Sequence, residues 1–171
     1  MFTKSDIEKY FIAEKQESMF FLVIGLIAIS LSAYFYFVHK APFQKGLAIP
    51  ILLIGFIQAV VGYTVYDRSD RQRIDNVYAY DMNPSKLQVE ELARMKTVNH
   101  NFIVYRWVEI ACLTAGIILV VMFCKEDTNR FVLGVGTGLA IQAAIMLTAD
   151  FFAERRALWY TKGIEEFLQI K

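Results

Sequence analysis

The sequence is poor in the residue types that define several common protein classes. Its 171 residues include two cysteines, two histidines and three prolines, and only 20% are charged. Two cysteines are too few for a disulfide framework or a zinc site. The net charge of +1 leaves no basic surface for nucleic acid. Because no Ser-His-Asp, Cys-His or HExxH pattern occurs, we expect no enzymatic activity, no metal and no cofactor.

Apolar residues are abundant and occur in four long runs. Hydrophobic residues make up 56% of the chain, and the mean hydropathy is +0.39. The runs cover residues 19–38, 47–66, 102–124 and 131–152, and within 102–124 only Arg106 and Glu109 are charged. About 20 helical residues cross a hydrocarbon core of about 30 Å. The sequence therefore predicts an all-α integral membrane protein with four transmembrane helices.

The distribution of lysine and arginine predicts the orientation. Thirteen lie in the N-terminal segment, the central loop and the C-terminal segment, and four lie in the two short loops on the other side. Positive charge accumulates on the cytoplasmic side. We therefore expect a protein of the cytoplasmic (inner) membrane with both termini in the cytoplasm. The first apolar run is longer than the core of a signal peptide and follows a charged segment, so it is predicted to be the first span.

The order of the elements predicts an internal repeat within one compact bundle. Residues 1–82 and 83–171 each contain a polar helix, a span, a short loop and a second span. An offset of 84 residues aligns Gln58 with Gln142 and Thr64 with Thr148. Because both halves begin inside, the predicted duplication is parallel, about an axis along the membrane normal. The alternative is that any two helical hairpins resemble each other this closely.

Capping signals predict that the spans continue as cytoplasmic helical extensions. Ser5 followed by Glu8 is a capping-box pattern, and Asn83 followed by Pro84 is typical of a second helix start. From Pro84, no glycine or further proline occurs before Gly116. Gly163 is predicted to end the last long helix.

Small residues at helical spacing indicate how the spans pack. Helices in lipid associate through close packing and polar contacts, because lipid tails are as apolar as leucine. The predicted helix-packing residues are Gly25, Gly55, Ala59, Gly62, Gly116, Gly134 and Gly138.

Five polar residues form a candidate intramembrane polar or ion site: Arg106, Glu109, Asp150, Gln58 and Gln142. For the two glutamines the simplest interpretation is an interhelical hydrogen bond. Glu109 lies about 10 Å inside the predicted boundary at helical rise. It could form an ion pair with Arg106, one turn away, or act as a carboxylate that couples a proton or cation. Asp150, near the end of the fourth span, could also reach Arg106.

Four spans, internal termini and the lack of a catalytic set resemble small bacterial tetraspan groups, among them the immunity proteins that block pore-forming toxins. The resemblance concerns architecture and transfers no residue role. We expect an interaction protein that packs against another membrane protein or a second copy, because small residues lie on more helix faces than one bundle needs. The alternatives are a dimeric ion- or proton-coupled transporter or channel using Glu109, and a lipid enzyme with Arg106, Glu109 and Asp150 around a headgroup.

Overall fold

The computed structural model describes residues 2–126 and 128–169. Helix α1 (Lys4–Tyr34) ends in a π-helical turn, η1 (Phe35–His39), and α2 spans Pro42–Met82. A short α3 (Pro84–Lys86), a second π-helical turn η2 (Leu87–Glu91) and α4 (Leu92–Phe123) follow one another directly, and α5 spans Arg130–Phe167. No strand occurs among these residues. Four helices are long and apolar enough to cross a membrane, which confirms the predicted all-helical fold with four such helices.

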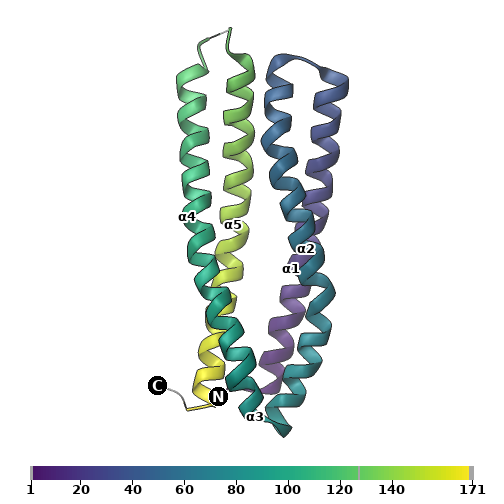
Figure 1. Cartoon of the computed structure of the whole chain (residues 1–171), viewed down its shortest axis with the longest axis vertical. Helices are drawn as coiled ribbons and strands as arrows, with labels where there is room; N and C mark the ends of the chain where they lie inside the picture. The colour runs from purple at the N-terminus through teal and green to yellow at the C-terminus, as the bar shows by residue number, and fades with distance from the viewer. Residues whose placement is uncertain (1, 127, 170–171) are drawn as a thin grey trace.

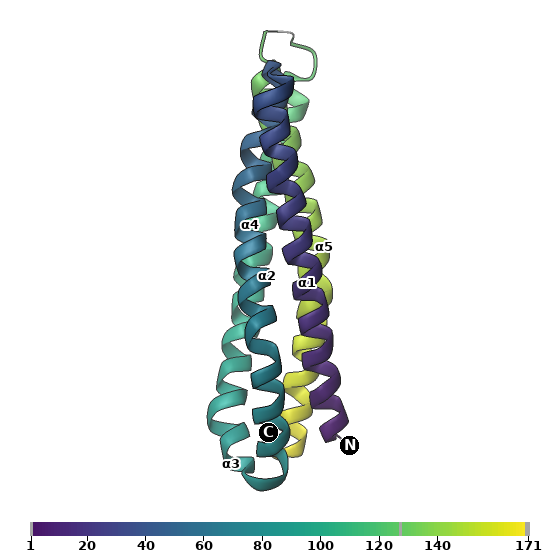
Figure 2. The ribbon, with the colours of Figure 1, turned by 90° about the vertical axis from the view of Figure 1, so that its right-hand side faces the viewer.

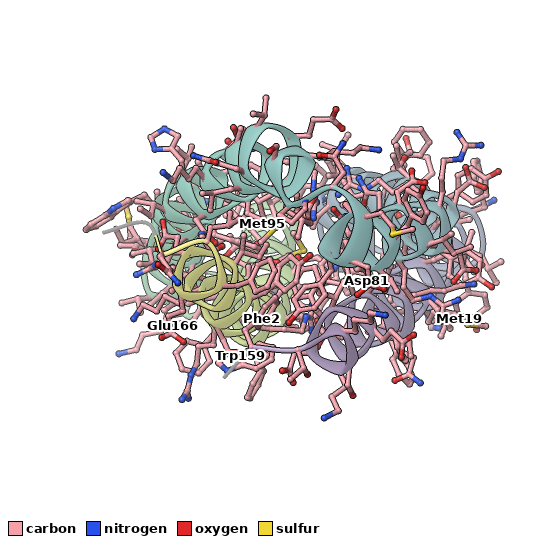
Figure 3. The ribbon with its side chains drawn as sticks, turned by 90° about the horizontal axis from the view of Figure 1, so that it is seen from below. Phe2, Met19, Asp81, Met95, Trp159 and Glu166 are labelled. Atoms are coloured by element: carbon pink, nitrogen blue, oxygen red, sulfur yellow. The ribbon has the colours of Figure 1, made fainter. Side chains whose placement is uncertain are left out.

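The helices lie along one long axis in the spatial order α1, α2, α5, α4 (Figure 1). Helix α1 packs along α2, α4 packs along α5, and α2 and α5 join the two pairs. In the apolar half, at the top of Figure 1, the helices form a row with α1 and α4 at its ends, and Figure 2 shows this row edge-on. Both termini and α3 lie at the opposite end. There, residues 4–18, 67–82, 84–101 and 153–167 form a four-helix bundle, which we call the extension bundle (Figure 3).

One predicted helix start is confirmed, and two other boundary predictions are wrong. The Asn83 side chain caps the helix at Pro84, accepting a hydrogen bond from the backbone N–H of Lys86 at 3.3 Å. The first helix, however, is capped by Thr3 with Asp6, two residues before the predicted box, and the Thr3 backbone N–H donates to Asp6 at 2.9 Å. Helix α5 also continues through Gly163, because that glycine serves packing: it lies against the ring of Phe2, where a Cβ would overlap.

Helices α1 and α2 cross with their backbones in contact at small residues. An added Cβ on Gly25 would lie 2.6 Å from the backbone of both Gly55 and Ala59. Further toward the extension bundle, a Cβ on Gly62 would lie 2.6 Å from the backbone nitrogen of Leu22. Such distances exclude any side chain. The absence of side chains lets the two backbones approach, and close packing is what holds helices together in lipid.

The same arrangement recurs between α4 and α5. A Cβ on Gly116 would lie 2.7 Å from the backbone nitrogen of Ala140 and 2.8 Å from the carbonyl oxygen of Gly136. Each helix pair is therefore joined by one glycine on its outer helix, facing a Gly-xxx-Ala motif on its inner helix.

A third set of glycines joins α2 to α5 near the short loops. Gly134 lies against the backbone of Phe43 and Leu47, and Gly46 lies reciprocally against α5. Gly138 faces Leu47 and the ring of Pro50, with a Cβ position 2.8 Å from Pro50 Cγ. Every glycine predicted to pack thus meets another helix of the same chain.

Large buried side chains gather in the extension bundle rather than in the apolar half. Figure 3 shows Phe2 and Met95 among the four helices at this end. Tyr10 and Tyr160 stack with ring centroids 3.9 Å apart. The buried cluster consists of Phe2, Ile7, Tyr10, Phe11, Leu92, Met95, Ala157, Tyr160 and Ile164. Because burial of apolar area from water is the main stabilising contribution to a folded core, this cluster is the hydrophobic core of the described chain.

We expect Gly116→Leu to disrupt the α4–α5 crossing, whereas Ala115→Leu, on the exposed side of the same turn, leaves it intact. Overpacking of this kind costs about 1–3 kcal/mol or more. Unfolding by sodium dodecyl sulfate in mixed micelles measures the difference. Equal stability of the two variants would contradict the assigned packing.

Candidate functional site

Three polar residues and one methionine lie along one face of α5 in the apolar half, where they meet polar side chains of α2 and α4. Gln142, Met146, Asp150 and Glu154 follow one another at intervals of four residues, and side chains four apart share a helix face. Each has a polar neighbour on α2 or α4. We call these four residues the α5 polar stripe. It runs from the middle of the fourth span to its boundary with the extension bundle.

Gln58 and Gln142 meet in the middle of the molecule. The Gln142 Nε2 group donates a hydrogen bond to Gln58 Oε1 at 3.1 Å, and Gln58 Nε2 lies 3.1 Å from the sulfur of Met146. Both glutamines are buried. The amide pair therefore connects α2 to α5, the two helices that join the two helix pairs.

Glu109 lies one level below, toward the extension bundle. Its side chain is buried, with 7% of the residue exposed. Neither carboxyl oxygen accepts a hydrogen bond from a donor in the part of the chain that the structure describes. Its close polar neighbour is the half-buried carboxyl of Asp150 on α5. The structure therefore places two carboxyl groups side by side where the sequence indicated one deep acid.

Of the two alternatives for Glu109, the ion pair with Arg106 is not formed among the described residues. Arg106 pairs with Glu154, at the end of the α5 polar stripe. Because α4 and α5 are antiparallel, Arg106 lies level with Glu154, while Glu109 lies level with Asp150. The arginine extends toward the polar end of the helix pair, as long basic side chains do near a membrane surface. Glu154 and Met146 were missed from the sequence, although their spacing from Gln142 could have identified them.

The extension bundle contains a second buried polar group. The Tyr10 hydroxyl donates to Glu14 Oε1 at 3.2 Å, and the Ser69 hydroxyl donates to Glu14 Oε2 at 3.2 Å. Burial raises the pKa of the Tyr10 phenol, and of the Tyr160 phenol stacked on it, above the usual value. Both phenols therefore stay neutral, and Tyr10 remains a hydrogen-bond donor to Glu14.

Ion pairs at the junction of the two halves connect three of the helices. Lys15 of α1 binds Asp70 of α2, and Glu17 of α1 binds Arg156 of α5. The hydrogen bond from Lys15 lowers the pKa of the Asp70 carboxyl. These contacts fix α1 against its neighbours at the level where the chain leaves the predicted membrane.

The described residues contain no group of three or more His, Cys, Asp or Glu side chains that could hold a metal ion. Comparison with known protein families, with curated proteins and with solved structures gives no match. The fold itself defines the class: a helical protein with four helices able to span a membrane.

The glutamine pair predicts a small, measurable coupling. Interhelical hydrogen bonds in membranes average about 0.6 kcal/mol and reach about 1.7. In a double-mutant cycle with Gln58→Leu and Gln142→Leu, we expect a coupling energy in that range, measured by unfolding in mixed micelles. Strictly additive effects would show that the two amides do not stabilise each other.

Proposed function

We propose that this chain is an integral protein of the cytoplasmic membrane, built as two tandem helical hairpins, with both termini and the extension bundle in the cytoplasm. The excess of lysine and arginine at the end that holds the termini supports this orientation. The contact between Gln58 and Gln142, which the offset of 84 residues aligns, supports an internal repeat, because equivalent positions meet at the axis that relates the two halves.

Within that topology the protein acts without catalysis, by packing against a partner membrane protein. The observation behind this proposal is an exposed apolar stripe on α2 in the extension bundle. Ile74, Tyr78 and Met82 are 63%, 64% and 68% exposed and occupy one helix face. Lipid would cover such residues inside the membrane, but these lie beyond it, and exposed apolar patches in water mark interaction sites.

The stripe continues a face of α2 that begins inside the membrane. Leu53, Ile57 and Val60 are exposed on the same face, one or two turns apart. Asp67 and Arg71 interrupt the apolar residues at the level of the membrane surface. A partner that covers the whole face therefore needs a membrane helix that continues into the cytoplasm as an amphipathic helix.

The glycines do not contribute to this proposal. The sequence suggested that small residues lay on more faces than one bundle needs. In the structure, each predicted packing glycine instead contacts another helix of the same chain. The partner surface is therefore assigned to the α2 stripe. An accessory subunit of a larger membrane protein and an immunity-type blocker of a pore-forming toxin both bind in this way.

A photo-crosslinking residue at position 78 tests the partner surface. We expect a covalent adduct with one membrane protein, and co-expression of that protein should give a stoichiometric complex. Tyr78→Glu should weaken the complex at least about tenfold, or by about 1.4 kcal/mol. Leu158→Glu, an exposed apolar position on α5, is the matched control and should have no effect. A monomer without adducts, or an adduct only between two copies of this chain, would contradict a separate partner.

A second candidate function is ion- or proton-coupled transport by a dimer. The α5 polar stripe favours it, because Gln142, Asp150 and Glu154 form a polar line from mid-membrane to the cytoplasmic end, with Glu109 beside it. Polar groups inside a membrane mark ion and proton pathways. The membrane half is a row of helices, so a pathway would need a second copy to enclose it.

Reconstituted vesicles test this second function. We expect wild-type protein to conduct a proton or ion flux that Glu109→Gln abolishes. Glu90→Gln, at an exposed carboxylate of the extension bundle, should leave the flux unchanged. No flux with wild-type protein, or equal flux in all three proteins, would exclude transport through this site.

A further inference from the structure

Glu109 and Asp150 form a contact between two carboxyl groups that is not explained by binding of a partner or by ion transport alone. The two carboxyl groups come from different helices and meet where α4 and α5 pack. Glu109 is nine-tenths buried, and both its oxygens lack a donor among the described residues. An ionised carboxylate inside a membrane costs a few kcal/mol unless it is paired or hydrated. Two adjacent ones also repel each other, and the repulsion is strong at low dielectric.

The charged groups around the contact offer no compensation. From α4, the nearest cation is Arg106, which is engaged by Glu154. From α5, the charged neighbour of Asp150 is that same Glu154, a third acid. From α2, the group at the adjacent level is the neutral Gln58. Within the described chain, the site is therefore acidic and holds no cationic side chain of its own.

A metal ion does not fit this site. Hard cations such as Mg²⁺ and Ca²⁺ take about six to eight oxygen ligands. Apart from Glu154, which is engaged by Arg106, the described residues provide two carboxyl groups here, and the backbone carbonyls on both sides are engaged in helices. A single hydrogen between two carboxyl oxygens needs no further ligand. Like-charged carboxyl pairs in proteins keep one proton for this reason.

We propose that Glu109 and Asp150 together form a binding site for one exchangeable proton, held between α4 and α5 at neutral pH. The inference depends on the α4–α5 contact alone and stands whether the protein binds a partner or transports an ion. Half-buried Asp150, on the side of the extension bundle, is the group through which the proton exchanges with the cytoplasm. When the proton leaves, two adjacent negative charges weaken the α4–α5 contact.

The stability of the fold should therefore depend on pH with a defined sign. The site holds its proton in the folded protein, whereas separated carboxyl groups in the unfolded chain release theirs at lower pH. The stabilisation is thus complete in acid and is lost as the pH rises through the titration of the folded pair.

Infrared difference spectroscopy of the full protein in nanodiscs tests the site directly. At neutral pH, we expect a carbonyl band of a protonated carboxyl that shifts in D₂O and disappears at alkaline pH. Glu109→Gln should abolish it, and Asp150→Asn should shift its frequency, because Glu109 stays buried and neutral but loses its carboxyl neighbour. Glu8→Gln, at an exposed carboxylate, should leave the band unchanged. The two variants in the pair substitute for each other if one does not fold.

Three results would overturn the proposal. The first is no protonated band in wild-type protein at neutral pH, and the second is a band that Glu109→Gln leaves in place or Asp150→Asn leaves unshifted. The third is a band that Na⁺ removes and choline does not, which would assign the site to a metal cation. Vesicle flux is measured separately. Wild-type protein that shows the protonated band but conducts no proton or ion would reject the second candidate function and leave the proton site in place.

Discussion

The fold depends on backbone-to-backbone contact at glycine. Between helices in lipid, apolar burial gives no preference for protein over hydrocarbon, so packing must come from close approach. Gly25 on Gly55 and Gly116 on Gly136 provide that approach within the two helix pairs, and Gly134 provides it between them. Large side chains pack only in the extension bundle, where Tyr10 and Tyr160 stack at 3.9 Å. The molecule thus uses two packing mechanisms, one in the apolar half and one in the extension bundle.

The glycine contacts also decide which polar groups meet. Close packing of α4 on α5 fixes an antiparallel register in which Glu109 lies beside Asp150 and Arg106 lies beside Glu154. A shift by one turn would place the arginine against Asp150 and remove the uncompensated carboxyl pair. The unusual chemistry of the site is therefore a consequence of packing at Gly116, about two turns away along α4.

Much of the fold follows from the sequence, because each prediction uses a strong local signal. Apolar runs of about 20 residues predicted the four helices, and Asn83-Pro84 predicted the start of the second half. Predictions failed where contacts between residues far apart in the sequence determine the local structure. Gly163 continues a helix because Phe2, remote in sequence, needs the space, and Glu109 lost its expected partner because Glu154 competes for Arg106. The stripe on α2 was equally hidden, since exposure at Ile74 and Met82 depends on how all four extensions pack.

In the proposed topology, four helices cross a membrane and leave the extension bundle in the cytoplasm. Single cysteines tested with a membrane-impermeant maleimide measure this most directly, with Cys112 and Cys124 first replaced by serine. In intact cells, the account predicts labelling of a cysteine at position 45, in the first turn after the outer loop. Ser85→Cys, two residues after Asn83, should react only after the cells are opened. Labelling of both positions or of neither in intact cells, or recovery of the protein in the aqueous fraction without detergent, would contradict the account.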